Sequence, residues 1–112
     1  MDGKEYLSAA CESVREEIEK ALGNGSIYDY FEDRDIYRED FTASISHRGA
    51  VYSSVSLMVA FGGPNVCIDT GTGAIEGYWW GVRASAPLSE EAVEAIDAWE
   101  LERLQCIGID IA

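Results

Sequence analysis

Basic side chains are scarce in this chain. Eight Lys and Arg residues stand against 21 Asp and Glu residues, which leaves a formal net charge of −13 over 112 residues. A folded domain with so negative a field repels nucleic acids and membrane surfaces and attracts basic protein surfaces. The sequence also lacks the clusters of Lys and Arg that bind nucleic acid directly. We therefore expect a basic protein partner, and neither nucleic acid nor a membrane.

Cysteine and histidine are also few. The three cysteines, Cys11, Cys67 and Cys106, are odd in number and far apart, which fits a reducing compartment better than a disulfide framework. No paired spacing of metal ligands exists, so we expect neither a metal nor a cofactor. No apolar run reaches the roughly 18 residues of a membrane span. The first residues also lack the basic start and apolar run of a signal peptide. These absences favour a cytoplasmic protein.

What the chain does contain is enough apolar sequence for a core, since 47% of its residues are hydrophobic. Its length predicts one acidic domain over residues 1–112. Apolar side chains recur at steps of three and four from Leu7 to Leu22, which predicts an amphipathic helix over residues 4–22. A second helix is expected to begin at Ser89, a good N-cap residue followed by two glutamates.

Between the two helices the apolar pattern has the period of a strand. It predicts four strands over residues 41–47, 51–61, 66–70 and 74–80. In the long second strand, Val55, Leu57 and Val59 share one face and Tyr52 lies on the other. Short connections predict an antiparallel meander with the two helices covering one face, an α+β fold of order α-β-β-β-β-α. Residues 106–112 are apolar and would add an edge strand or pack beneath the sheet.

The acidic residues gather in particular segments. Residues 26–40 hold six acids and two bases, and residues 89–105 hold six acids and one base, whereas the predicted sheet is nearly uncharged. Carboxylates one helical turn apart lie roughly 6 Å from each other. Such a row can imitate part of a phosphate track for a partner that reads phosphates with Lys and Arg. The alternative is an acidic surface that serves solubility alone.

Aromatic side chains accompany the acids. Tyrosines interleave with the acids of residues 26–40, which suits contact with an Arg-rich surface, although some of these rings could instead pin a loop to the core. Trp79 and Trp80 point to opposite faces of a strand, so one is expected in the core and the other nearer solvent beside Tyr78 and Arg83. The predicted partner-binding residues are Asp29, Tyr30, Glu32, Asp33, Asp35, Tyr37, Glu39, Asp40, Trp80, Glu90, Glu91, Glu94 and Asp97.

Catalytic motifs are weak. Asp69-Thr70-Gly71 matches the aspartic-protease tripeptide, but a hairpin turn explains it fully. A pair formed by Cys67 and His47 is compatible with the sequence, because such residues meet only in space. We expect no enzymatic activity and no catalytic residues, and we keep a small enzyme that uses Cys67, His47 or Asp69 as a third interpretation.

The block from Val55 to Trp99 contains the AFGGPN turn, the hairpin after it, the GYWWG strand end and the acidic final helix. On these motifs the chain resembles a group of short, uncharacterised acidic proteins of prophages and conjugative elements. Small acidic proteins of mobile elements resemble, as a class, anti-restriction and anti-CRISPR inhibitors, several kinds of which mimic DNA. The resemblance implies that context and carries over no catalytic residue.

Two functions are compatible with these observations. The first is a non-enzymatic inhibitor that binds a bacterial nucleic-acid-targeting defence complex, anti-CRISPR or anti-restriction, through an acidic DNA-mimic surface. The second is an interaction or assembly module of a mobile element that binds through its sheet and aromatic surface. A monomer and a homodimer both fit the sequence.

Overall fold

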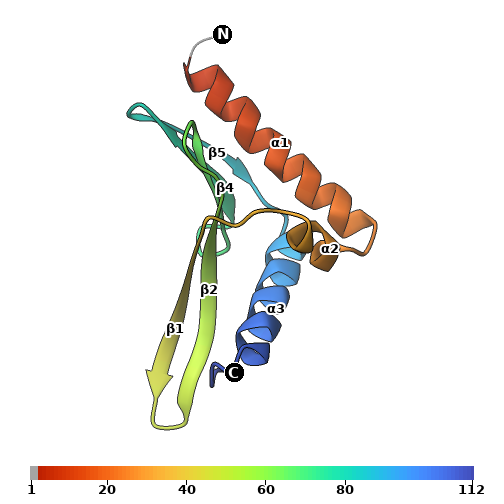
Figure 1. The fold of residues 1–112 in the computed structure, drawn as a ribbon, viewed down its shortest axis with the longest axis vertical. Helices are drawn as coiled ribbons and strands as arrows, with labels where there is room; N and C mark the ends of the chain where they lie inside the picture. Colours follow the sequence, from red (N-terminus) through yellow and green to blue (C-terminus); the bar gives the residue numbers. More distant parts are fainter. Residues whose placement is uncertain (1–2) are drawn as a thin grey trace.

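The computed structural model describes residues 3–112. Its helices and strands, labelled in Figure 1, are α1 (Gly3–Gly23), α2 (Ile27–Glu32), β1 (Arg38–Ser46), β2 (Gly49–Ala60), β3 (Asn65–Asp69), β4 (Ala74–Trp79), β5 (Val82–Pro87) and α3 (Glu90–Cys106). The α+β class and the flanking helices are confirmed. The short α2 lies within residues 26–40, the segment rich in tyrosine and acids for which no helix was predicted. None of the described helices is long and apolar enough to cross a membrane.

The sheet is an antiparallel meander of five strands in the order β1-β2-β3-β4-β5, so the expectation of four strands was wrong. The missed strand is β5, which buries only the small side chains of Ala84 and Ala86 and therefore lacks the bulky β-branched pattern of a typical strand. It follows a two-residue turn, Trp80-Gly81, in which both residues have positive φ. Two-residue turns of this kind usually have the sequence Asn-Gly or Asp-Gly, which makes them recognisable.

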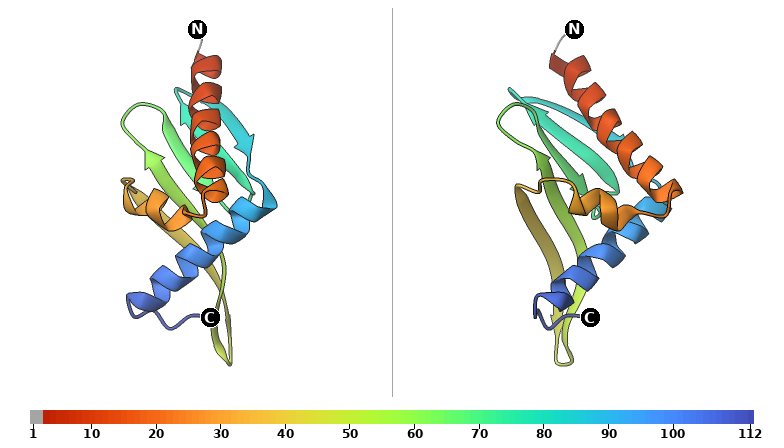
Figure 2. Two further views of the ribbon diagram at one scale, coloured as in Figure 1. Left: turned by 90° about the vertical axis from the view of Figure 1, so that its right-hand side faces the viewer. Right: turned by 45° about the vertical axis from the view of Figure 1, so that its right-hand side comes forward.

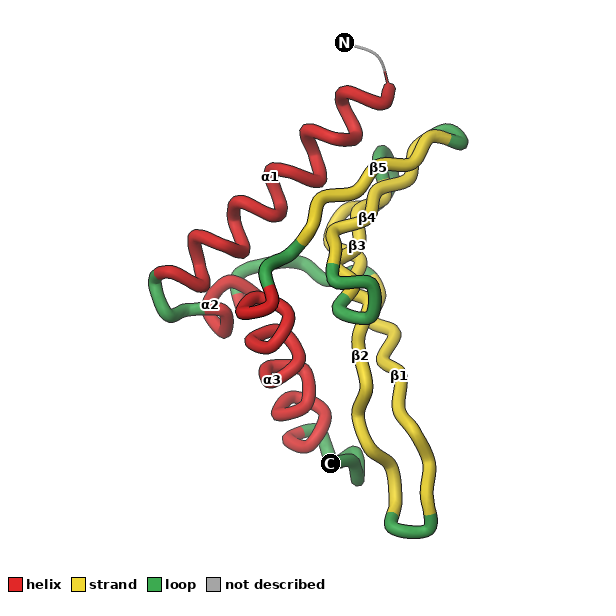
Figure 3. The backbone as a smooth tube through the Cα atoms, turned by 180° about the vertical axis from the view of Figure 1, so that it is seen from behind, coloured by secondary structure: helices red, strands yellow, loops and turns green. Residues whose placement is uncertain are grey.

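All three helices lie on one side of the sheet (Figures 1 and 3). The predicted first helix is confirmed as α1, which buries Leu7, Cys11, Val14 and Ile18 against β4 and β5. The side chains of Leu7 and Cys11 contact the backbone of β4 at Gly77. A Cβ atom added to this glycine would lie only 2.8 Å from Leu7 Cδ1 and from Cys11 Sγ. The absence of a side chain at this position therefore sets how closely α1 approaches the sheet.

Hydrogen bonds link α3 to α1, and an aromatic stack links α3 to α2. Ser89 caps α3 as predicted, accepting a hydrogen bond from Ala92 N, and its own amide and hydroxyl donate to the carboxylate of Glu19 on α1. On the other side of α3, the ring of Trp99 stacks on Phe31 of α2 with ring centroids 4.3 Å apart. The three helices thus form a single layer over the sheet (Figure 2).

Two irregularities in the pairing of β2 change which side chains face the helices. The register shifts opposite Thr42 and Ala43, so Tyr52 turns to the covered face and its hydroxyl donates to Asp97 of α3 at 2.6 Å. The expectation that Tyr52 and Val55 lie on different faces of the strand was therefore wrong. A second shift after Met58 brings Ala60 against the core. A strict period of two cannot anticipate either bulge.

The C-terminal residues lie beside β2 rather than forming a strand of the sheet. Ile111 is buried and makes a single parallel bridge with Ala50. The amide of Tyr52 donates to the carbonyl of Ala112 at 2.9 Å. Beyond this point the β1–β2 hairpin projects past the end of α3 (Figure 1).

The contact at Gly77 gives a stability prediction. Gly77→Ala is expected to lower the free energy of unfolding by about 1–3 kcal/mol, because the new methyl group must displace two fully buried side chains. Urea unfolding of both proteins measures the difference. Gly63→Ala is the matched control, since its Cβ meets nothing within 4 Å and its φ is not positive. Equal stabilities for the two variants would contradict the close approach of α1.

Candidate functional site

The helices and the segment that follows α2 carry most of the exposed acidic side chains, and all three helices lie on one side of the sheet. We call these exposed residues the acidic helical layer: Glu16, Glu17, Asp29, Glu32, Asp33, Asp35, Glu90, Glu91, Glu94 and Glu102. Within residues 3–112, Glu17 pairs with Arg34, and no Lys or Arg lies within ion-pair distance of the others. The segregation of charge along the sequence thus becomes a segregation in space.

Seven of the predicted partner-binding residues belong to this layer: Asp29, Glu32, Asp33, Asp35, Glu90, Glu91 and Glu94. Tyr37 is exposed but lies away from the helices, next to the ring of Phe61. Asp40 lies on the opposite, uncovered face of the sheet, where it pairs with Arg38 at 2.7 Å. The structure therefore brings the acids of α2 and α3 together but leaves Tyr37 and Asp40 outside the layer.

Three other predicted residues are engaged inside the protein. The carboxylate of Glu39 pairs with Arg103, and that of Asp97 accepts the hydroxyl of Tyr52. Tyr30 is half-buried against Phe31, with the guanidinium of Arg34 5.4 Å from the centre of its ring. These side chains are held by internal contacts, so they can contribute to a partner surface only at their edges.

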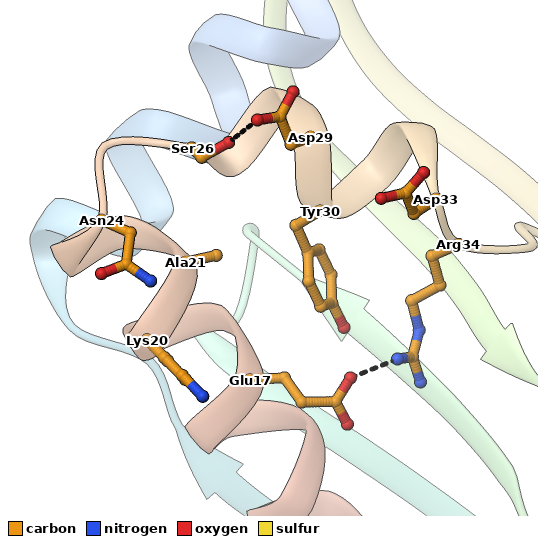
Figure 4. Close-up of a pocket in the computed structure, with 9 residues that line it drawn as sticks. All are labelled: Glu17, Lys20, Ala21, Asn24, Ser26, Asp29, Tyr30, Asp33 and Arg34. Carbon is orange, nitrogen blue, oxygen red and sulfur yellow. Dashed lines mark hydrogen bonds and ion pairs between the residues drawn. The ribbon is translucent and has the colours of Figure 1, made fainter.

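A cleft of about 420 Å³ joins α1 to α2 within the acidic helical layer (Figure 4). The Tyr30 ring stands in it, and the ion pair between Glu17 and Arg34 closes one end. Burial raises the pKa of the Tyr30 hydroxyl, and the charge of Arg34 opposes that shift. The remaining charged lining is Lys20, Asp29 and Asp33. The cleft links the carboxylates of the two helices across one concave surface.

Sequence reasoning missed a buried carboxyl pair beneath α3. Glu100 is fully buried, and its Oε1 accepts a hydrogen bond from Arg103 Nε at 3.2 Å. Burial, and next the neighbouring Glu39, raise the pKa of Glu100 to about 8. At Glu39, burial favours a higher pKa, but the hydrogen bonds from Glu100 and Arg103 outweigh it. The pKa of Glu39 is therefore lowered. The pair therefore shares one proton at neutral pH.

A signal for this pair was present in the sequence. Glu100 falls at the four-residue spacing of the inward stripe of α3, together with Ala92, Ile96 and Leu104. A glutamate on such a stripe must be paired or protonated when the helix packs. The charge count for residues 89–105 included Glu100 without assigning it to either face of the helix.

The uncovered face of the sheet has a different chemistry, which we call the open face. Reading across the strands by register, its three rows are Arg38, Met58, Cys67, Glu76 and Ser85; then Asp40, Ser56, Asp69, Ala74 and Pro87; then Asn65, Tyr78 and Arg83. The guanidinium of Arg83 lies 4.9 Å from the centre of the Tyr78 ring. Lys4 reaches the same corner and donates to the carbonyl of Arg83. Acidic and basic side chains are balanced there.

One of the two neighbouring tryptophans is packed and the other exposed, as expected, but Trp80 lies in the turn after β4 and not on the predicted strand. Trp79 packs on Tyr6 of α1, whereas Trp80 is 88% exposed at the β4–β5 turn. Trp80 has φ of 52°, the only positive φ of a residue other than glycine in the described chain. A left-handed backbone at a bulky residue costs free energy, and so does an exposed indole. Neither packing nor backbone geometry accounts for a tryptophan at this position.

Cys67 and His47, the pair considered in the enzymatic interpretation, do not meet. Cys67 is half-buried on the open face, and burial raises the pKa of its thiol. His47 lies at the tip of the β1–β2 hairpin, roughly 30 Å along the strand from the residue paired with Cys67, at about 3.3 Å per residue. Asp69 Oδ1 accepts hydrogen bonds from Gly71 N and Thr72 N, as its turn requires. In residues 3–112, no group of three or more His, Cys, Asp or Glu side chains could hold a metal ion.

The buried carboxyl pair predicts a pH dependence of stability. Between the ordinary pKa of 4.5 and about 8, folded Glu100 keeps a proton that the unfolded chain releases, so the free energy of unfolding falls as pH rises through this range. One such proton contributes a slope of about 1.4 kcal/mol per pH unit. Glu100→Gln should flatten the slope, whereas Glu94→Gln, an exposed change on the same helix, should keep it. Urea unfolding from pH 5 to 8 measures the slopes, and equal slopes would contradict the shared proton.

The backbone of Trp80 predicts a difference between two small replacements. Trp80→Gly should be more stable than Trp80→Ala by about 1 kcal/mol, because only glycine adopts the left-handed conformation without strain. Both variants remove the exposed indole, so the comparison isolates the backbone. Thermal unfolding measures the difference. An alanine variant as stable as the glycine variant would show that the turn is unstrained.

Comparison of the chain with models of protein families, with curated protein sequences and with solved structures gave no match. Function is therefore inferred from the charge, exposure and packing of this chain's own residues. Two surfaces stand out on those grounds, the acidic helical layer and the open face with Trp80 at its edge.

Proposed function

We propose that this protein is a non-enzymatic inhibitor that binds the nucleic-acid-binding surface of a bacterial defence complex, a CRISPR effector or a restriction enzyme. The acidic helical layer would occupy the site of the phosphates. One observation carries the proposal: within residues 3–112, nine of the ten exposed carboxylates of the acidic helical layer have no cationic partner, while the open face is balanced. The sequence resemblance to acidic proteins of mobile elements points in the same direction.

The arrangement of the carboxylates suits a partner that reads a phosphate backbone. Glu91 and Glu94 are exposed one turn apart on α3. Asp29 on α2 and Asp33, the C-cap residue that follows this helix, are exposed four residues apart. Such pairs lie roughly 6 Å apart, whereas each strand of a duplex carries one phosphate charge per about 3.4 Å of helix axis. The acidic pairs therefore present a similar but less dense line of negative charge. The hydroxyl of Tyr28 on α2 donates to Glu102 on α3, which links the two acidic helices.

The layer destabilises the protein that carries it. Like charges one turn apart on a helix repel each other by a few tenths of a kcal/mol per pair. Four arginines form ion pairs with carboxylates of the same chain: Arg15 with Glu12, Arg34 with Glu17, Arg38 with Asp40 and Arg103 with Glu39. The exposed acids of α3 are left without compensation. A surface that binds a basic partner regains this energy on binding, because each carboxylate then acquires a cation.

A second candidate function is an assembly module that meets its partner through the sheet and its aromatic edge. The observation that favours it is Trp80, which combines a strained backbone with 88% exposure. Tryptophan is enriched among the residues that contribute most binding energy at the centre of protein interfaces. The two candidates differ in their response to salt, because an electrostatic contact weakens steeply as salt screens it and an aromatic contact does not.

Cleavage assays test the first candidate. A panel of purified CRISPR effectors and restriction endonucleases would cleave plasmid DNA with and without the protein, at low and at high salt. The proposal expects inhibition of at least one enzyme, relieved by salt or by excess competitor duplex that carries no cleavage site. Neutralising four exposed acids, Asp33→Asn, Asp35→Asn, Glu91→Gln and Glu94→Gln, should abolish that inhibition while the circular dichroism spectrum stays unchanged.

A charge-matched control separates the surface from the net charge. Glu91→Gln with Glu94→Gln raises the net charge by two, and so does Ser44→Lys with Ser53→Lys on the exposed β1–β2 hairpin. The first pair should weaken inhibition about tenfold or more, and the second should leave it nearly unchanged. Equal losses for both pairs would show that total charge, and not the helical layer, is responsible.

A further inference from the structure

The charge of the open face distinguishes it from the rest of the surface. Lys4, Arg38 and Arg83 lie on or beside it, and so do Asp40, Asp69 and Glu76. Three cations and three carboxylates leave this face neutral in a chain whose formal net charge is −13. A neutral face has no preference for a strongly basic or a strongly acidic partner. It suits a surface of the same mixed make-up.

The open face also carries aromatic surface and a hollow beside it. Tyr78 and Phe61 are 40% and 68% exposed, and Trp80 projects at the edge. A hollow of about 420 Å³ lies between the Gly62-Gly63 turn and the β4–β5 turn and is lined by Asn65 and Tyr78. The two glycines leave open space at the rim, since a Cβ on either would meet nothing within 4 Å. Trp80 lines this same hollow, so its indole and Tyr78 form one aromatic corner of the open face.

We propose that a second copy of this chain packs on the open face to form a twofold-symmetric dimer. The acidic helical layer cannot form this contact, because two such layers would repel each other. Facing the open sides instead turns the two acidic layers outward and keeps them apart. The proposal is independent of the proposed function, since it uses the opposite side of the molecule.

The strand register specifies which residues meet. In the first row, Arg38, Met58, Cys67 and Glu76 occupy four successive strands. A twofold axis that runs along the strands, between β2 and β3, places Arg38 of one copy opposite Glu76 of the other. It also places Met58 opposite Cys67, and the aromatic corner at Tyr78 opposite Phe61 and Tyr37. Opposite charges and apolar groups therefore coincide across the axis.

Symmetry makes this contact sensitive to a single substitution. Because a twofold interface repeats every pair, Arg38 and Glu76 form two cross-copy pairs in each dimer. Reversing either charge creates two like-charge contacts, and reversing both restores two opposite-charge contacts. A double-mutant cycle on these positions therefore reports the pairing itself rather than a general change in charge.

Sedimentation velocity on the untagged full chain, over a concentration series up to about 100 µM, tests the proposal. We expect a dimer whose dissociation constant rises about tenfold or more in Arg38→Glu and in Glu76→Arg, and returns toward the starting value in the double reversal. Trp80→Asn should weaken the dimer while the protein stays folded, because asparagine tolerates the left-handed backbone. Glu94→Arg, an exposed reversal on α3 on the other side of the sheet, is the matched control and should leave the dimer unchanged.

Two results would overturn the dimer. One is a chain that sediments as a monomer throughout the series. The other is a dimer that the single reversals and Trp80→Asn leave unchanged, which would place the contact elsewhere on the molecule. Neither result bears on inhibition by the acidic helical layer, so failure of this proposal and failure of the proposed function are distinguishable.

Discussion

The close contact between α1 and the sheet at Gly77 governs the rest of the molecule. A strand residue without a side chain lets Leu7 and Cys11 reach the backbone of β4, and α1 then covers β4 and β5. The carboxylate of Glu19 on that helix binds Ser89 and so fixes where α3 begins. Both later helices are therefore held on the side that α1 occupies, and the opposite side of the sheet stays uncovered.

One-sided packing determines where the charge goes. Helices that bury one stripe against a common sheet must direct their polar residues away from it, so acids placed on those helices collect on one surface. The strands contribute only four acids, of which Glu39 pairs with Arg103 and Asp40 with Arg38. The result is a molecule with an acidic side and a neutral side, which suit different kinds of contact. Inhibition of a basic partner and self-association can then coexist without competing for the same residues.

Much of this fold could be predicted from the sequence, because α1 and α3 follow the helical period and the covered part of β2 follows the strand period. The missing strand, β5, is short and small-chained, and its turn uses Trp80 where Asn or Asp would be usual. Tyr52 was misplaced because a bulge adds one residue to the period. For the candidate site, the exposed acids of α2 and α3 could be predicted, but burial of Glu100 and the engagement of Asp97 depend on contacts between distant elements.

The central claim is that the acidic helical layer takes the place of nucleic acid on a protein. Its most direct test is capture of partners from nuclease-treated bacterial lysate on the immobilised protein, followed by elution with duplex DNA and identification by mass spectrometry. The account predicts a DNA- or RNA-handling complex that duplex DNA releases and that a column of the four-acid variant, with Asp33, Asp35, Glu91 and Glu94 neutralised, fails to retain. A partner that duplex DNA does not displace, or that the variant retains equally, would contradict it.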